Sequence, residues 1–308
     1  MTRYLGQTGF GQYTTIMAFL QFAAILVDMG LTLVVIQMIS QNPQQEKEIL
    51  NNIFTFRIIT AVILFTITPI IAQLLPYDPL IKLGIVLTTL AFFASTMTQF
   101  FLGIFQQKLQ TGKVALAENI GRLVLLIGVL LVIQQDLGLL AIMAAVTIGS
   151  IINCALNLYF SKKWFDVRFT YNAVMWNKIW HKSWPIALSI IFNLMYFKAD
   201  TLVLSLTRSN AETGIYGATY KVLEVLITLP FLFLGLILPF MTQHWEKKNK
   251  EKFFDISQKA FDTMALLSLP IIAGGYLLGQ KIMILVAGKE FILAGNVLQI
   301  LAIAITCI

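Results

Sequence analysis

Long apolar runs separated by short polar segments organise the whole sequence. Each run is about as long as the roughly 20 residues that an α-helix needs to cross the hydrocarbon core of a membrane. The polar segments between them are short enough to be loops. The pattern predicts nine helical spans, at residues 13–39, 53–75, 79–103, 115–133, 137–160, 184–206, 212–240, 257–280 and 290–308. Pro230 and Pro239 predict a kink or an early end within 212–240.

The stretch 184–224 differs from the other runs because it carries ionisable side chains inside apolar helices. It is predicted to form a helical hairpin around the polar segment 207–214. A charged side chain at the centre of a bilayer costs at least about 2.5–3.5 kcal/mol on insertion scales, so such groups face protein or water. The polar and ionisable residues here are Asn193, Lys198, Asp200, Tyr216, Tyr220, Lys221 and Glu224.

Composition places the chain among α-helical membrane proteins. Hydrophobic residues make up 58% of it, charged residues only 12%, and the mean hydropathy is +0.80. Soluble domains have about 25% charged residues. The net charge of +7 does not point to nucleic acid, because 15 of the 22 Lys and Arg residues fall in the alternate segments 40–57, 104–122, 161–183 and 243–259. The positive-inside rule makes that side cytoplasmic.

This orientation puts residues 1–12 outside with no preceding helix, and Ile308 ends inside an apolar run. We therefore interpret the chain as a fragment lacking a first helix and truncated at both ends. An internal repeat agrees, because Gly11-Gln12-Tyr13 and Gly214-Ile215-Tyr216 each open a long apolar helix. We expect an N-terminal lobe (1–160), a basic, Trp-rich cytoplasmic linker (161–183) and a C-terminal lobe (184–308). The linker is either an amphipathic helix on the membrane surface or an ordinary hinge.

Several motifs resemble one family in their order along the chain. They are Gly9-Phe10-Gly11-Gln12-Tyr13 followed by Asp28-Met29-Gly30-Leu31, then Trp184-Pro185 through Asp200 followed by Gly214-Ile215-Tyr216, and finally Gly288-Lys289-Glu290-Phe291 with Ala294. The sequence resembles the polysaccharide transport (Wzx-type flippase) family, in the superfamily that also holds the MATE drug exporters. The resemblance implies an all-α, two-lobed, MATE-like membrane bundle around a central cavity, of which this chain supplies helices two to ten.

The hairpin supplies the first candidate residues. Asn193 and Asp200 are seven positions apart and share a helix face, so Asp200 is a candidate cavity residue and ion-coupling site, or the partner of a cation on another helix. Tyr216, Tyr220 and Glu224 form one stripe with Lys221 at its edge. This stripe is either a sugar-binding cavity face, with Glu224 as a second ion-coupling candidate, or a helix-packing face.

Three further positions complete the predicted site. Arg122 either holds a diphosphate or forms a local pair with Glu118 at i,i+4. Asn153 and Asn157 either contact the substrate or form hydrogen bonds between helices. Asp28 is a candidate cavity residue or part of a structural turn before Gly30. We expect no catalytic residue, no metal and no cofactor, and no G-x-x-x-x-G-K-[ST] segment indicates an ATPase.

The resemblance implies a flippase that moves an undecaprenyl-diphosphate-linked oligosaccharide across a bacterial or archaeal cytoplasmic membrane, for cell-surface polysaccharide synthesis. Its expected partners are this glycolipid, membrane lipids and other polysaccharide assembly proteins. Alternating access is the expected mechanism. The alternatives are an ion-coupled drug or cation antiporter, which would need an acidic and aromatic cavity, and a membrane-embedded glycosyltransferase or polymerase, which the short outer loops disfavour.

Overall fold

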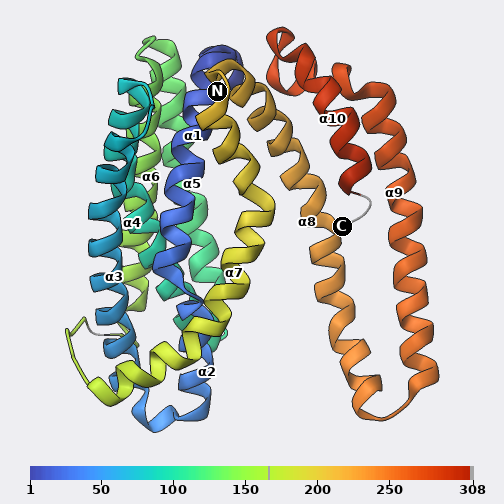
Figure 1. Cartoon of the computed structure of the whole chain (residues 1–308). Coiled ribbons are helices and arrows are strands. Elements are labelled where there is room, and N and C mark those ends of the chain that lie inside the picture. The colour runs from blue at the N-terminus through green and yellow to red at the C-terminus, as the bar shows by residue number, and fades with distance from the viewer. Residues whose placement is uncertain (166, 306–308) are drawn as a thin grey trace. The chain divides into compact units, whose positions relative to one another are not determined.

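The computed structural model describes residues 1–165 and 167–305, and nearly all of them are helical. The helices in chain order are α1 (Thr2–Asp28), α2 (Leu31–Gln41), the 3-10 turn η1 (Pro43–Gln45), α3 (Glu46–Leu74), α4 (Pro79–Gln107), α5 (Thr111–Gln134), α6 (Gly138–Ser161), α7 (Ala173–Thr207), α8 (Asn210–Glu246), α9 (Lys250–Ala287), the 3-10 turn η2 (Lys289–Phe291) and α10 (Ile292–Ile305). Figure 1 labels them. Within this described part, eight segments are long and apolar enough to cross a membrane.

The predicted spans correspond to these helices, with differences at their ends. The last predicted span is represented by α10, which has 14 described residues, while residues 306–308 lie outside the described part. The segment 1–12, which the predicted spans leave out, is helical from Thr2, with a non-helical Gly6 (φ 64°) dividing it. Helix α8 continues through Pro230 and Pro239 to Glu246, so it does not end early.

Polar caps explain why α7 and α8 begin where they do. The Asn172 side chain accepts hydrogen bonds from the backbone N–H groups of Val174 and Met175 and starts α7 well before the predicted residue 184. Ser209 and Glu212 form a reciprocal capping box that starts α8. The predicted polar turn 207–214 is therefore mostly helical, and only Arg208 and Ser209 separate the two helices.

Helix α7 contains Pro185, and Figure 1 shows its first turns lying at an angle to the rest. Proline lacks a backbone N–H and its ring meets the carbonyl four residues earlier, which bends a helix. The residues before the bend, 173–183, belong to the predicted linker, and Met175, Ile179 and Ser183 among them are buried. The linker thus ends in helical turns that pack on the protein.

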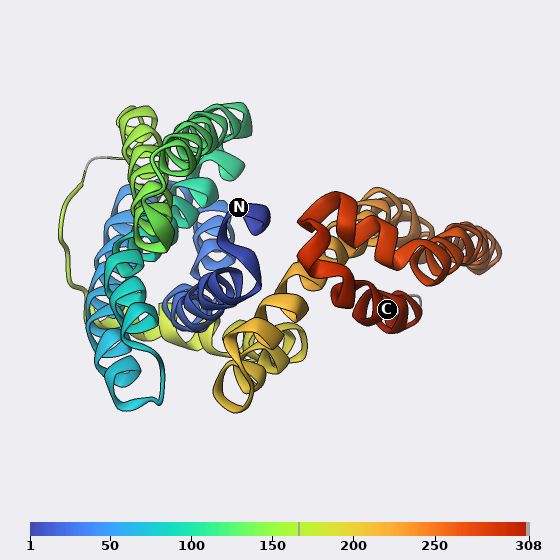
Figure 2. The same cartoon turned by 90° about the horizontal axis from the view of Figure 1, so that it is seen from above.

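By contact, the chain divides into two compact units. Unit 1 comprises Met1–Gly11 and the described residues from Ser209 onward, and unit 2 comprises Gln12–Arg208. In unit 1, α10 packs against both α8 and α9. In unit 2, seen nearly end-on in Figure 2, α4 packs against α2, α3, α5 and α6. The lobe boundary at 161–183 stays a prediction.

The core of unit 2 is rich in aromatic residues at one end of the bundle. The rings of Phe54 (α3), Phe100 (α4) and Phe165, which follows α6, form a triangle with centroids 5.1–5.2 Å apart. All three side chains are buried. Aromatic pairs at such distances stabilise a core by about 0.5–1.5 kcal/mol each beyond the area they bury. The triangle fixes the chain leaving α6 against α3 and α4.

Unit 1 contains a close crossing of α1 and α8 at two glycines. A Cβ atom added to Gly11 would lie 1.7 Å from the backbone oxygen of Asn210, and one added to Gly214 would lie 2.0 Å from that of Gln7. The contact is reciprocal, because each glycine meets the carbonyl four residues before the other. Small residues allow helix backbones in membranes to approach this closely. The two glycines that align in the predicted repeat are thus in contact.

Candidate functional site

A break between α1 and α2 places a carboxylate inside unit 2. Met29 (φ 44°) and Gly30 (φ 71°) both lie in the left-handed region, and Gly30 is needed because a Cβ there would be 2.4 Å from the side chain of Ile186. The Asp28 carboxylate accepts hydrogen bonds from the Gly30 backbone N–H (3.2 Å) and from Thr32 Oγ1 (3.0 Å). Asp28 therefore forms the structural turn that was one of its two predicted roles.

The same carboxylate forms an ion pair with Arg57 of α3. The Arg57 side chain is fully buried and its Nη1 atom lies 3.5 Å from Thr32 Oγ1. Arg57 therefore lies inside α3 and not in the cytoplasmic loop segment 40–57, to which the alternation of basic residues assigned it. Arg57 lies 11 positions after Glu46, or about 16 Å along the helix at 1.5 Å per residue. Asp28 and Arg57 thus form a largely buried ion pair, and Thr32 hydrogen-bonds beside it.

Burying two charges costs several kcal/mol per ion, and the pairing and hydrogen bonds between them offset this cost. The Nε atom of Arg57 has no hydrogen-bond partner among the residues that the structure describes. The sequence carried a signal for this residue, because Arg57 falls inside the predicted span 53–75 with Phe56 and Ile58 on either side. What the sequence could not supply was its partner, 29 positions away.

The hairpin residues predicted on α7 are exposed. Asn193 and Asp200 both have exposed side chains, while Lys198 is half-buried. The Asp200 carboxylate accepts a hydrogen bond from the backbone N–H of Thr201 at 2.6 Å. Because these residues lie in a helix long and apolar enough to span a membrane, their polar groups need protein or water rather than lipid around them. Asn193 and Asp200 stay candidates for a transport path.

On α8 the predicted stripe divides into a packed part and an exposed part. The rings of Tyr216 and Tyr220 are 5.8 Å apart, and Tyr220 is only 8% exposed, so it packs within unit 1. Lys221 and Glu224 form an ion pair of 2.8 Å near the helix surface. The packing alternative thus describes Tyr220, whereas Lys221 is exposed and Glu224 is partly exposed.

The candidates on α5 and α6 form local contacts. Arg122 pairs with Glu118 on the same helix, with Nε 3.1 Å from the carboxylate, which is the i,i+4 alternative expected from the spacing. Asn157 is buried and donates to the side-chain oxygen of Asn153 at 2.8 Å, so this pair lies along α6 itself. A Cβ on Gly121 would be 2.9 Å from Asn153, which shows that α5 and α6 pack closely beside that pair.

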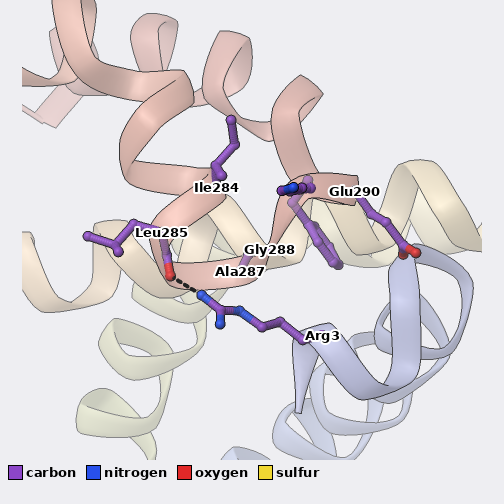
Figure 3. A pocket seen from close by; sticks show the side chains of 8 residues that line it. Arg3, Ile284, Leu285, Ala287, Gly288 and Glu290 are labelled. Atoms are coloured by element: carbon purple, nitrogen blue, oxygen red, sulfur yellow. Dashed lines mark hydrogen bonds between the residues drawn. The ribbon is translucent and has the colours of Figure 1, made fainter.

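Unit 1 has a cavity of about 500 Å³ at the end of α9 (Figure 3). Arg3 donates a hydrogen bond of 2.6 Å to the backbone oxygen of Leu285, one of the last carbonyls of α9. Gly288 follows with φ 114°, and a Cβ there would be 2.9 Å from Arg3. Arg3 thus satisfies and complements a helix C-terminus. The Gly288–Phe291 motif has a structural role at this turn.

Another contact fixes the loop between α3 and α4. The Tyr77 hydroxyl lies 3.0 Å from Ser205 Oγ near the end of α7. Burial raises the pKa of the Tyr77 phenol above its ordinary value, although the hydrogen bond with Ser205 acts in the opposite direction. The phenol is therefore neutral at physiological pH and holds the α3–α4 loop to α7.

The helical bundle and its apolar spans define a multi-pass protein of the cell membrane. The chain belongs to the polysaccharide biosynthesis protein family, whose sequence model matches residues 1–245. It is 23% identical over 304 residues to the "Probable low-salt glycan biosynthesis flippase Agl15" of Haloferax volcanii, covering 97% of this chain and 62% of that protein. The chain thus spans less than two thirds of that relative's length.

A solved structure shares the fold. It is an inward-facing conformation of a multidrug resistance MATE family transporter of the MOP superfamily, with a TM-score of 0.71 at 14% sequence identity. The match covers 98% of this chain and 74% of the other. This likeness establishes the MATE-like helical fold that the sequence motifs predicted.

Proposed function

We propose that this chain belongs to a flippase that moves an undecaprenyl-diphosphate-linked oligosaccharide across the cytoplasmic membrane for cell-surface polysaccharide synthesis. Membership of the polysaccharide biosynthesis family and the printed name of the Haloferax volcanii relative support a lipid-linked glycan as the cargo. The observation that carries the proposal is the exposure of two polar side chains, Asn193 and Asp200, on α7, a helix long and apolar enough to span a membrane. Such groups fit a water-filled path for a polar headgroup.

The proposed mechanism is alternating access. The N-terminal lobe (1–160) and the C-terminal lobe (184–308) rock about the linker 161–183, so that a path opens to one side of the membrane at a time. Protonation or sodium binding at Asp200 or Glu224 biases the equilibrium between the two states, because a ligand shifts a population only by its difference in affinity for them. Tyr216 and Lys221 lie on the same helix as Glu224 and are proposed to contact sugar or phosphate.

The test is complementation of a flippase-null bacterium with the gene that carries this sequence, measured as surface polysaccharide. We expect Asp200→Asn to lower surface polysaccharide at least tenfold at equal protein level, because it removes the titratable group while keeping the shape. Asp255→Asn is the matched control, since Asp255 forms an exposed i,i+4 pair with Lys259 and should be neutral. Arg122→Ala tests the diphosphate role of Arg122 in the same assay.

Two results would contradict the proposal. Full activity of Asp200→Asn would remove Asp200 from the path. Failure of the well-expressed parent to restore polysaccharide with several lipid-linked substrates, together with efflux of a cationic dye, would favour the drug antiporter.

A further inference from the structure

The turn between α1 and α2 is strained, and a carboxylate holds it. Met29 (φ 44°) and Gly30 (φ 71°) both have left-handed backbone conformations. Glycine adopts this conformation freely, whereas methionine does so only where the surrounding structure holds it there. Asp28 Oδ2 accepts a hydrogen bond from the Gly30 backbone N–H at 3.2 Å, and Oδ1 accepts one from the Thr32 hydroxyl at 3.0 Å. The carboxylate therefore joins the end of α1 to the first turn of α2.

The two members of the ion pair differ in their exposure. The Arg57 side chain is completely buried, whereas the Asp28 side chain keeps 23% of its surface exposed. Arginine is not deprotonated in proteins, so Asp28 is the member of the pair that can gain a proton. Two effects oppose each other there, because desolvation favours the protonated carboxyl and the neighbouring cation favours the ionised one. A proton therefore competes with Arg57 for this carboxylate.

The hydroxyl of Thr32 has two acceptors within reach. Its Oγ1 atom lies 3.0 Å from Asp28 Oδ1 and 3.3 Å from the backbone oxygen of Gln99 in α4. A hydroxyl carries one proton, so it donates to one of these oxygens at a time. Arg57 Nη1 lies 3.5 Å from Thr32 Oγ1, and this contact is compatible with either choice. The cluster thus has two hydrogen-bond arrangements, one that joins α2 to α1 and one that joins α2 to α4.

The other ionisable groups of the neighbouring helices lie further along those helices. Helix α2 has no ionisable side chain between Leu31 and Gln41, and it packs against α3, α4 and α7. The ionisable residues of these helices and of α1, apart from the pair itself, are Glu46, Lys47 and Glu48 on α3, Lys82 on α4, Lys178, His181, Lys182, Tyr196, Lys198 and Asp200 on α7, and Arg3, Tyr4 and Tyr13 on α1. Lys182 donates a hydrogen bond to Gln41 at the opposite end of α2 from the turn. Arg57 is therefore the charge that acts most directly on Asp28.

We infer that Asp28 is a proton-binding site that switches the turn between α1 and α2. When a proton binds to Oδ1, it replaces the hydrogen bond from Thr32 and the charge contact with Arg57. The Thr32 hydroxyl then donates to the backbone oxygen of Gln99, so α2 is joined to α4 instead of α1. The strained turn loses part of what holds it and opens.

The turn also contacts the bend of α7. A Cβ on Gly30 would lie 2.4 Å from the side chain of Ile186, which directly follows Pro185. A change at the turn therefore reaches the bent part of α7, because closely packed elements transmit a displacement to their neighbours. The proton site goes beyond the proposed function, since it needs neither Asp200 nor Glu224.

Infrared difference spectroscopy of the purified full protein in detergent tests proton binding. The C=O stretch of a protonated carboxyl is separate from the carboxylate bands, so it reports the gain of a proton. We expect this band to grow between about pH 7 and about pH 5, where carboxyl groups with the ordinary pKa of about 4 stay ionised. Asp28→Asn should abolish the Asp28 component of the band, and Asp200→Asn should retain it.

Hydrogen–deuterium exchange at the same two pH values tests the switch. After correction for the intrinsic effect of pH on exchange, we expect the amides of residues 29–34 in the wild type to exchange roughly tenfold faster at the lower pH, because the turn opens more often. Asp28→Asn, which mimics the protonated side chain, should exchange fast at both pH values. Asp28→Asn with Arg57→Met should show no pH response, and removing both charges of a buried pair together preserves stability.

The matched control removes a different ion pair. Asp255→Asn with Lys259→Met removes an exposed pair and should keep both the infrared band and the exchange response. A wild type without the band, or a band without faster exchange, would overturn the inference. A pH response that persists in Asp28→Asn with Arg57→Met and disappears in His181→Gln would assign the response to His181 and overturn it as well. A single gel-filtration peak for each variant excludes misfolding. Neither assay needs a cargo, so both are independent of the transport test.

Discussion

Arg57 illustrates how one side chain can dominate the energetics of a membrane bundle. It is fully buried, and its only charged partner among the described residues is Asp28, which is itself held by Gly30 and Thr32. Removing one member of a buried ion pair leaves an uncompensated charge, which costs about 3–5 kcal/mol, whereas replacing both by apolar groups is often neutral. The cost of a substitution therefore depends on which member remains.

We expect Asp28→Asn to lower the free energy of unfolding by about 3 kcal/mol, because Arg57 stays charged in the core. Adding Arg57→Met to that variant should recover most of the loss, which is the signature of direct coupling in a double-mutant cycle. Denaturant unfolding in detergent measures both.

The control is the exposed pair Asp255–Lys259, where the same cycle should give less than about 1 kcal/mol. If Asp28→Asn and Arg57→Met add independently, the two residues are not energetically coupled.

At the scale of the helices, the crossing of α1 and α8 depends on the absence of two side chains. Nothing on α8 can yield at Gly11, because the atom in the way is the backbone oxygen of Asn210. Gly235, on the same helix α8, has open space around it. Comparing substitutions at Gly11 and Gly235 therefore separates the effect of helix packing from the effect of glycine's low helix propensity.

We expect Gly11→Ala and Gly214→Ala each to lower the thermal stability of the protein, since a Cβ at either position would overlap a backbone oxygen and the two helices must move apart. Gly235→Ala should be neutral or slightly stabilising, because alanine favours a helix by about 1 kcal/mol over glycine. Combining Gly11→Ala with Gly214→Ala should cost less than the sum of the two, because the first substitution already separates the helices. Strict additivity, or destabilisation by Gly235→Ala, would contradict the crossing.

For the whole molecule, the alternation of basic segments along the sequence predicts which ends of unit 2 face the cytoplasm. Gln44 and Gln135 are both exposed, the first in η1 and the second after α5. In a variant with Cys154 and Cys307 replaced by alanine, we expect Gln135→Cys to react with a membrane-impermeant maleimide on intact cells. Gln44→Cys should react only after the membrane is opened. The reverse result would invert the orientation.

The sequence determined the helices well and the contacts between them poorly. The length of the apolar runs located the spans, because a membrane-crossing helix needs about 20 mostly apolar residues in a row. The predicted spans left out residues 1–12, because glycines and polar side chains interrupt the apolar pattern there. The structure nevertheless has helix in this segment, and that helix crosses α8. Arg57 was assigned to a loop for a related reason. In the sequence, a buried cation cannot be distinguished from a loop cation until its partner is known.

Among the candidate site residues, local spacing predicted the pairs within one helix. The i,i+4 pair of Arg122 and Glu118 and the contact of Asn153 with Asn157 follow from helical geometry alone. Burial, which separates Tyr220 from Glu224 on one stripe, depends on which neighbouring helices cover each position.

The reciprocal contact of Gly11 and Gly214 has a consequence for the ancestry of the chain. Each glycine meets the residue four places before its counterpart, which is the arrangement of an isologous interface in a two-fold dimer. If the two halves arose by duplication, one glycine in a half-length ancestor would have faced its own copy, and a single mutation would have altered both sides of the contact. After such a fusion the two positions would be separate genetic sites, free to diverge, and in this chain both are glycine.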